Sequence, residues 1–566
     1  MAGTWHGLTH QPLFNTSTMI LLTDGRIMVQ EEATKHWHAL TPVNGSYLNG
    51  TWSNLADMSI WRRYYASGVL KDGRVIVCGG EQSGGGGDTT ICEIYDPVAD
   101  SWAIIPSPPG WPTVGDAVCC VLPDGRVMIG ALYPSTACAI YNPSTNTWSA
   151  AASKATSSNE ETWILQPDQT ILTTQCWAPY QSEKYIISSN TWQNEGALPV
   201  TLVDPVMHEI GPGMLLYNGK TIFFGAQNSG GHGKTAIYTP PALPTGVGTW
   251  VAGPDIPQVA GKTIVSNDCP ATLLPNGKVL FAGAQYENND WGSPIEFFEY
   301  DPSANTITQA PTPANNGMKL YWSRMMLLPT GEVLFSPSTN NVQLYEPDGM
   351  PLEAWRPTIS SITPHGTVFF TDYYTLQGTQ LNGLSQANIY GDDCYPATNY
   401  PIVKLHNAGT GHTYFARTSH FSSMGIATGG ALQSCRFTVQ GIPDGNYDVC
   451  VIANGIASHV MSLNITRFRK PEIIDSGVKR EFEYFGKLVF EGDPWDRKDW
   501  VVDPQIVEMQ QQIKSLSNAV SRLSSLIESR ELPHVGKEIA GAVGIAAGGT
   551  LENGREKKSR KSSIEV

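Results

Sequence analysis

One unit of sequence recurs seven times in the first 356 residues, and this repeat constrains the fold more than any other feature. The general unit is an apolar run, a short turn of the Asp-Gly type, a second apolar run, a Tyr-Asp-Pro-like segment and, in most copies, a Trp. The turns are Asp24-Gly25, Asp72-Gly73, Asp124-Gly125, Asp168-Gln169, Asn218-Gly219, Asn276-Gly277 and Thr330-Gly331. Such dipeptides favour type I′ hairpins, and continuous apolar runs are typical of strands buried on both faces. The pattern predicts a seven-bladed β-propeller.

The last unit lacks an outer-strand Trp of its own. The other units carry Trp52, Trp102, Trp148, Trp192 and Trp250, with Ile307 in the sixth. The segment Gly3-Thr4-Trp5 matches Gly50-Thr51-Trp52 and Gly248-Thr249-Trp250. We therefore expect the N-terminal strand to complete the last blade, which would leave only short, protected sheet edges.

The repeat stops at residue 356, and a different pattern follows. Residues 357–466 alternate apolar and polar runs with Gly-rich turns, which predicts an immunoglobulin-like β-sandwich. Cys435 and Cys450 fall on strands expected to be neighbours there, so a disulfide between them is left open. Residues 467–503 are charged and irregular and are interpreted as a linker.

A helix is predicted at 504–532, and a flexible tail at 533–566. Apolar residues follow alternating spacings of three and four over about three heptads, at Ile506, Met509, Ile513, Leu516, Val520, Leu523 and Ile527. This seam favours a parallel two-stranded coiled coil, and hence a homo-oligomer formed through residues 506–527. The alternative is a helix that packs back on the propeller.

Charge and hydropathy limit the partners and the location. The net charge of −15 argues against nucleic acid as a partner, because an acidic surface repels phosphates. No stretch reaches the roughly 18 apolar residues that a membrane span needs, and no signal peptide is evident. The expected location is therefore cytoplasmic, with export by an unconventional route left open. Ten Cys residues show no paired zinc-type spacing.

Two segments resemble the galactose oxidase and glyoxal oxidase family. They are Arg62-Arg-Tyr-Tyr-Ala-Ser-Gly-Val-Leu-Lys-Asp-Gly-Arg-Val-Ile-Val-Cys-Gly-Gly and Tyr321-Trp-Ser-Arg-Met-Met-Leu-Leu-Pro-Thr-Gly-Glu-Val. The resemblance covers residues 1–466 and implies a Kelch-type propeller with a C-terminal sandwich. It also implies oxidation of a primary alcohol or an aldehyde at a copper ion, with a tyrosine radical.

The residues that this chemistry needs are only partly present. By the resemblance, Tyr64 matches the radical Tyr, Tyr321 the axial Tyr, and His420 the His from the sandwich. Trp322 stands where the family has a second His ligand, and Thr16 where it has a Cys cross-linked to the radical Tyr. One imidazole is a poor substitute for two in a copper site. We therefore do not expect copper or a standard copper-radical oxidase.

The repeat also predicts which side chains face the axis at one mouth of the propeller. These stand eight residues before each turn, at Thr16, Tyr64, Asp116, Glu160, Ile210, Asp268 and Trp322, with Glu161, His208, Glu209, Tyr321 and Arg324 beside them. Asp116, Glu160 and Asp268 would repel one another, and a cation, with calcium first, would relieve that repulsion. The aromatic side suits a sugar or an ammonium group. The alternative is a water-filled channel mouth.

Three functions remain open from the sequence. The first is a binding module for a glycan, another small polar ligand or a protein. The second is an enzyme that uses the acidic mouth for a metal-assisted or acid/base reaction. The third is a copper oxidase of alcohols or aldehydes. The fold alone does not choose among them.

Overall fold

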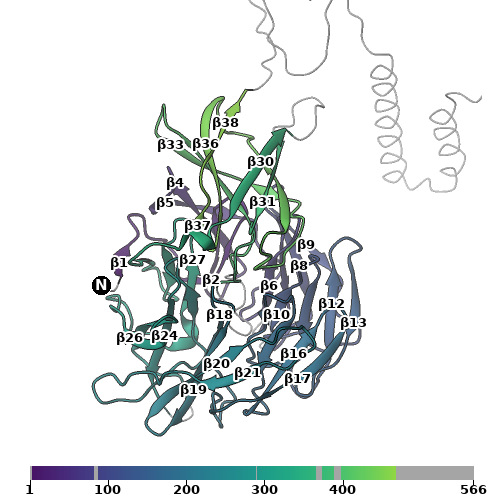
Figure 1. Ribbon diagram of the computed structural model, residues 1–566, viewed down its shortest axis with the longest axis vertical. Coiled ribbons are helices and arrows are strands. Elements are labelled where there is room, and N and C mark those ends of the chain that lie inside the picture. Colours follow the sequence, from purple (N-terminus) through teal and green to yellow (C-terminus); the bar gives the residue numbers. More distant parts are fainter. Residues whose placement is uncertain (1–2, 82–86, 288–289, 365–372, 388–396, 467–566) are drawn as a thin grey trace, which may run out of the picture. The chain divides into compact units, whose positions relative to one another are not determined.

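The computed structural model describes residues 3–81, 87–287, 290–364, 373–387 and 397–466 (Figure 1). All of them lie in one compact unit, Met1–Arg469. Within these ranges the regular structure is antiparallel β-sheet, apart from the 3₁₀ helices η1 (Leu320–Trp322) and η2 (Glu353–Trp355). The all-β class is confirmed. The predicted linker, coiled-coil helix and tail lie outside the described residues.

Seven sheets follow the seven sequence units. The first three are formed by β2 (Thr16–Leu21), β3 (Ile27–Glu31), β4 (Trp37–Val43) and β5 (Ser46–Leu55); by β6 (Ala66–Val69), β7 (Val75–Cys78), β8 (Cys92–Asp96) and β9 (Ser101–Ile105); and by β10 (Cys119–Val121), β11 (Val127–Gly130), β12 (Cys138–Asn142) and β13 (Thr147–Ala151). Each is a meander in which every strand pairs with the next in sequence.

The fourth to sixth sheets keep this order. They are formed by β14 (Ile164–Leu165), β15 (Ile171–Thr174), β16 (Gln181–Ile186) and β17 (Thr191–Ala197); by β18 (Gly213–Leu215), β19 (Thr221–Ser229), β20 (His232–Thr239) and β21 (Thr249–Ala252); and by β22 (Ile264–Val265), β23 (Ala271–Leu273), β24 (Val279–Gln285), β25 (Ile295–Asp301) and β26 (Thr306–Gln309). In the sixth, both β22 and β23 pair with β24. The sheets are compatible with a Kelch propeller.

The seventh sheet joins the two ends of the repeat region. It is formed by β27 (Arg324–Leu327), β28 (Val333–Ser336), β29 (Gln343–Glu346) and β1 (Thr4–Gly7). Strand β1 pairs antiparallel with β29, which places Trp5 opposite Tyr345. The prediction that the N-terminal strand completes the last sheet is confirmed.

The outer-strand Trp residues connect consecutive sheets. In six sheets the indole Nε1 donates a hydrogen bond to a backbone carbonyl at the end of the preceding outer strand. The pairs are Trp5–Pro311, Trp52–His10, Trp102–Ala56, Trp148–Pro106, Trp192–Ala152 and Trp250–Glu195. A Trp at this place therefore joins its own sheet to the preceding one, which explains its recurrence in the sequence.

The hairpin turns differ from the predicted type I′. Gly25 has a positive φ of 79°, but Asp24 is not among the residues with positive φ. The N–H of Gly25 donates to the Leu22 carbonyl, and the N–H of Leu22 to that of Arg26. This is a turn followed by a left-handed residue, as in three-residue hairpin loops. The prediction is wrong because Asp24 is selected by its side chain, which accepts a hydrogen bond from the N–H of Arg26.

Residues after 357 form two further antiparallel sheets. One contains β30 (Thr358–Pro364), β31 (Tyr373–Thr379), β35 (Leu432–Thr438) and β34 (Thr418–Ser419). The other contains β33 (His412–Ala416), β32 (Ile402–Asn407), β36 (Gly445–Ala453), β37 (Ile456–Ala457) and β38 (Met461–Ile465). We refer to these two sheets as the C-terminal domain.

The expectation of neighbouring strands for Cys435 and Cys450 is wrong. Cys435 lies in β35, which pairs with β31 and β34, whereas Cys450 lies in β36 of the other sheet. Both are buried free thiols. Sequence proximity suggested a hairpin, but consecutive strands of a two-sheet domain often change sheet.

The C-terminal domain contacts the hairpin turns of the first four sheets. Backbone hydrogen bonds join Thr418 to Thr23, Phe421 to Lys71, and Met424 to Pro123. Gln169 donates to the carbonyl of Ile426. This domain therefore covers the turn ends of the inner strands and leaves their opposite ends, where the predicted site lies, outside this contact. Across the described ranges, no helix is long and apolar enough to cross a membrane.

Candidate functional site

Three of the seven predicted axial positions have a left-handed backbone. Tyr64, Glu160 and Asp268 have φ of 48°, 55° and 44°, and each stands just before its sheet's inner strand. Such values are uncommon for residues other than Gly, Asn and Asp, and strained backbone persists only where the surrounding structure imposes it. We call this end of the sheets, where the inner strands begin, the mouth. Tyr64 and Glu160, which are neither Gly, Asn nor Asp, share this conformation at equivalent positions, and we take the mouth as the candidate functional site.

Carboxyl groups gather on one side of the mouth. Asp116 forms a side-chain hydrogen bond with Glu160. Burial, and then the charges of Glu81 and Asp88, raise the pKa of Asp116 to about 7. Burial and Asp88 also raise the pKa of Glu81, while Arg63 opposes this shift. Near neutral pH, Asp116 is thus able both to donate and to accept a proton.

We expect Asp116→Asn to stabilise the protein at pH 8 by about 1–3 kcal/mol, an effect that disappears towards pH 4. The pKa of Asp116 is raised in the folded state, so the folded protein binds more protons between about pH 4 and 7. Stability therefore falls as the pH rises through this window, and Asn removes that loss. Urea unfolding at several pH values measures it.

Asp301 provides a control of opposite sign. Hydrogen bonds from Ser303 lower the pKa of Asp301. The ionised Asp301 side chain therefore stabilises the folded protein above the pKa that it has in the unfolded chain. This stabilisation is lost as the pH falls through its pKa in the folded protein. Asp301→Asn should therefore be less stable than the parent at neutral pH. If Asp116→Asn behaved in the same way as Asp301→Asn, the assigned environment of Asp116 would be wrong.

Glu161 does not belong to the mouth. Its carboxylate lies 2.7 Å from Lys154 Nζ and accepts hydrogen bonds from Trp163 and Thr173. Burial raises its pKa to about 7, although Lys154 opposes this shift. The side chain is fully buried, so Glu161 is an interior ion-pair residue and Glu160 is the one at the mouth.

Aromatic rings gather on another side of the mouth. The ring of Tyr321 lies 4.7 Å from that of Trp291, 5.5 Å from Trp322 and 6.4 Å from Tyr64, centroid to centroid. The guanidinium of Arg324 lies 5.7 Å from the Tyr64 ring, and its Nη1 donates to the carbonyls of Tyr321 and Ser323. Trp322 is 40% exposed. Arg324 therefore fixes the segment that presents this apolar surface to solvent.

A second aromatic group was missed by the sequence reasoning. Trp177 is stacked between Tyr133 and His208, at centroid distances of 4.4 and 4.1 Å with 20° between the planes in both cases. Tyr133 is 62% exposed, and His208 also has a left-handed backbone, with a φ of 60°. The neighbouring Glu209 is buried. Tyr133, Trp177 and Trp291 lie outside the repeat positions, so the repeat gave no signal for them.

Residues 385–387, which lie between β31 and β32 in the chain, contact the inner strands of three sheets. The Gln386 side chain accepts a hydrogen bond from the Leu165 N–H, Ser385 donates to the Leu215 carbonyl, and the Leu273 N–H donates to Ala387. This contact was also missed, since nothing in the composition of residues 381–400 distinguishes them from a surface loop.

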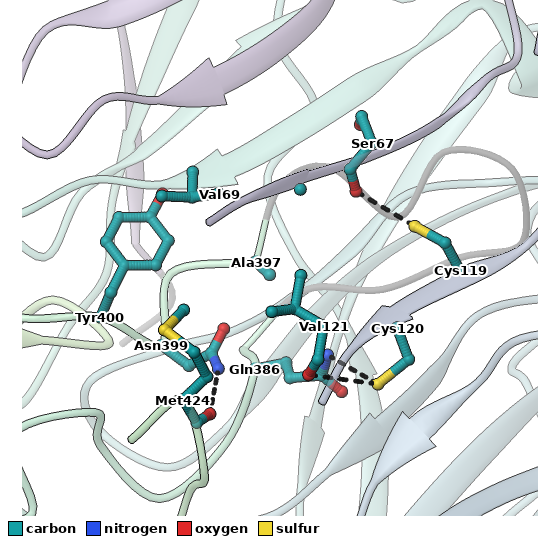
Figure 2. A pocket seen from close by; sticks show the side chains of 11 residues that line it. Ser67, Val69, Cys119, Cys120, Val121, Gln386, Ala397, Asn399, Tyr400 and Met424 are labelled. Carbon is teal, nitrogen blue, oxygen red and sulfur yellow. Dashed lines mark hydrogen bonds between the residues drawn. The ribbon is translucent and has the colours of Figure 1, made fainter. Parts of the chain in front are cut away.

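Figure 2 shows a small cavity beside this contact, where Gln386, Asn399 and Tyr400 meet Cys119 and Cys120. Its volume is about 20 Å³, which is room for one water molecule. Cys119 donates to the Ser67 carbonyl at its edge. A ligand larger than water does not fit in this cavity.

The structure places His420 away from the mouth. It follows β34 and lines a cavity of about 370 Å³ with Lys71, Asp72, Asp124 and Arg126. These residues belong to the hairpin turns, at the opposite end of the inner strands from Tyr64. The prediction that His420 reaches the axis beside Tyr64 is wrong, because backbone hydrogen bonds hold this segment on the turns.

Among the described residues, the structure brings together only two of the side chains matched to a copper-radical site. Tyr64 and Tyr321 are close together, but His420 is elsewhere, Trp322 offers no ligand atom, and Thr16 is hydrogen-bonded to Ser336 and the Thr339 carbonyl. Among the described residues, no group of three or more His, Cys, Asp or Glu side chains could hold a metal ion. A calcium ion at Asp116, Glu160 and Asp268 stays a prediction.

Comparisons with known proteins agree with a Kelch repeat. Residues 62–109 match the Kelch motif. The structure is similar to a fungal alcohol oxidase of the AA5 family in complex with copper, at 14% identity and a TM-score of 0.47, over 82% of this chain and 99% of that one. It is also similar to YjhT, at 14% identity and a TM-score of 0.37, over 54% of this chain and 99% of that one. Curated protein sequences gave no match.

The chain thus carries a Kelch motif within an all-β architecture. The match to the Kelch motif covers the second sheet with its flanking loops, including Tyr64. The resemblance inferred from the segments at Arg62 and Tyr321 is confirmed at this level.

Proposed function

We propose that the chain is a seven-bladed Kelch propeller with an immunoglobulin-like C-terminal domain, and that its mouth binds a small polyhydroxylated ligand such as a glycan. It acts as a binding module in place of copper-radical chemistry. The observation that carries this proposal is the coexistence of the Asp116–Glu160 carboxyl pair and the Tyr64–Tyr321–Trp322 cluster at equivalent ends of the inner strands.

The chemistry of the two groups is complementary. Carboxyl groups donate and accept hydrogen bonds with sugar hydroxyls, and the aromatic rings cover the apolar face of a sugar ring. The strained backbone at Tyr64 and Glu160 supports a preorganised site. Calcium at Asp116, Glu160 and Asp268 is a separate prediction and is not part of this proposal. Self-association through residues 506–527, and binding of a protein partner, remain separate predictions.

We expect Trp322→Ala to weaken binding of a sugar by up to about tenfold, since a stacked ring contributes about 0.5–1.5 kcal/mol. Saturation-transfer NMR with a panel of monosaccharides would identify a ligand, and calorimetry would then compare the variants. Leu352→Ala is the matched control, because Leu352 is 59% exposed beside η2, on the side of the hairpin turns. Equal losses for both variants, or no binding by the parent, would overturn the proposal.

A second candidate function is acid/base catalysis at the same mouth. The pKa of Asp116, raised to about 7, suits proton transfer near neutral pH, with Glu160 as its hydrogen-bonded partner. Turnover of a bound sugar, with a pH dependence that Asp116→Asn abolishes, would favour this candidate over simple binding.

A further inference from the structure

Two buried cysteines face each other at one end of the β7–β8 hairpin. Cys78 is the last residue of β7, Cys92 is the first of β8, and the two are direct partners in the ladder. The neighbouring pair exchanges a hydrogen bond from the Gly79 N–H to the Ile91 carbonyl. Cys78 and Cys92 are therefore a non-hydrogen-bonded pair, whose Cα atoms lie about 4.5 Å apart in antiparallel sheets. Disulfides span about 4.4–6.8 Å between Cα atoms.

The side chains are already in contact. The two thiols form a side-chain hydrogen bond, and both are buried and unbridged. The repeat itself does not require this pair. At the equivalent ladder positions, the third sheet has Gly130 opposite Cys138, and the first has Gln30 opposite Trp37. The arrangement is thus particular to the second sheet.

The position of the pair links it to the mouth. The segment between the cysteines contains Glu81 and Asp88, the two carboxylates whose charges raise the pKa of Asp116. A covalent bond between Cys78 and Cys92 would fix both ends of this segment.

We propose that Cys78 and Cys92 form an intramolecular disulfide when the protein meets a disulfide oxidant such as oxidised glutathione. One cysteine thiolate attacks glutathione disulfide and releases one glutathione thiolate, which takes up the proton. The second cysteine thiolate then attacks the mixed disulfide and releases the second glutathione. Overall, two cysteine thiols lose two protons and two electrons, and one glutathione disulfide becomes two glutathione molecules. This inference is independent of the proposed ligand.

Burial makes the reaction slow in the folded protein. It raises the pKa of the Cys78 thiol, so little thiolate forms until the end of the ladder opens. The rate should therefore rise with pH. Once formed, the disulfide closes a loop of about 15 residues and restricts the unfolded chain, so the unfolding midpoint should shift upward and return after reduction.

The test uses the full chain in buffers of increasing oxidised-to-reduced glutathione ratio. One arm is incubated folded and one is refolded from urea in the same buffers, so that burial cannot hide the reaction. Free thiols are alkylated, and the protein is cleaved after acidic residues. Cleavage at Glu81 and Asp88 places Cys78 and Cys92 on different peptides. Cleavage at Asp96, Asp100 and Asp116 likewise separates Cys92 from Cys119. Mass spectrometry should find the Cys78 and Cys92 peptides joined, with a loss of two hydrogens.

Cys138 is the internal control, because it occupies the position equivalent to Cys92 but faces Gly130. It should remain fully alkylated wherever the Cys78–Cys92 bond forms. Alkylation of Cys78 and Cys92 in both arms at every glutathione ratio would overturn the proposal. So would a preferred bond from Cys78 to Cys119, which also lies within electrostatic range of Cys78.

Discussion

Replacement of Lys154 with Met is expected to destabilise the protein by about 3–5 kcal/mol. The ammonium group lies 2.7 Å from Glu161 and 3.0 Å from Glu183, and it has no exposed side-chain surface. It also lies 4.9 Å from the centre of the Trp192 ring. Without it, two carboxylates remain buried with no counter-charge, and each must be neutralised or hydrated at the expense of packing. The urea midpoint and slope measure the loss.

Two comparisons separate this effect from loss of a long side chain. Lys234→Met removes an exposed ion pair with Asp255, 2.8 Å apart, and should cost no more than about 1 kcal/mol. The triple variant Lys154→Met, Glu161→Gln and Glu183→Gln should regain much of the stability that Lys154→Met alone loses, because it leaves no unpaired charge in the interior. The cost of Lys154→Met should also shrink as the pH falls, since the carboxyls then take up protons. A cost that is equal for Lys154 and Lys234 and independent of pH would contradict the assignment.

Trp5→Ala is expected to cost about 2–4 kcal/mol, although Trp5 is the fifth residue of the chain. Its ring packs against Phe297, Phe335 and Tyr345 at centroid distances of 5.0, 5.6 and 5.0 Å. Its indole donates a 2.7 Å hydrogen bond to the Pro311 carbonyl, which links the seventh sheet to the sixth. An N-terminal residue without such contacts would be replaceable with little effect. Thermal and urea unfolding of the variant measure the cost.

His6→Ala tests whether the contacts or the mere presence of the strand matter. His6 is exposed on the same strand, and its weak pair with Glu346 is also exposed, so the change should stay within about 0.5 kcal/mol. Trp148→Ala, in the third sheet, should resemble Trp5→Ala because its indole makes the equivalent bond to Pro106. A negligible effect of Trp5→Ala beside a large effect of Trp148→Ala would show that β1 does not hold the seventh sheet.

Local chemistry made several features of the fold predictable. In six of the seven turns an Asp or Asn accepts the backbone N–H two residues later, as Asp24 does from Arg26. The next residue takes a positive φ, and it is Gly in every turn except the fourth, which has Gln169. The displaced Trp5 could be assigned to the last sheet because its motif repeats that of Trp52. The prediction of turn type was nevertheless wrong. Asp occurs at these turns because its side chain accepts a backbone hydrogen bond, and its own φ is not positive as a type I′ turn would require.

The candidate site was only partly predictable. The repeat register assigned Tyr64, Tyr321, Asp116 and Glu160 to one mouth; in the structure Tyr64 lies near Tyr321, and Asp116 is hydrogen-bonded to Glu160. It assigned Glu161 to the same region, although Lys154 and Glu183 hold that carboxylate in the interior. Trp291 and Trp177 come from irregular loops, and no periodicity places a loop residue. His420 was misplaced for a similar reason: its position depends on how β34 docks on the hairpin turns.

The sequence by itself determined the repeat, the all-β class and the strand that joins the two ends, because each depends on turn chemistry and apolar pattern within about 50 residues. Only the tertiary structure decided which charges are paired, which rings meet at the mouth and which inner strands residues 385–387 contact. Those outcomes depend on burial and on contacts between residues far apart in the chain, such as Gln386 with Leu165. Desolvation and packing depend on how the sheets are assembled, and the pattern of residues along the chain does not show them directly.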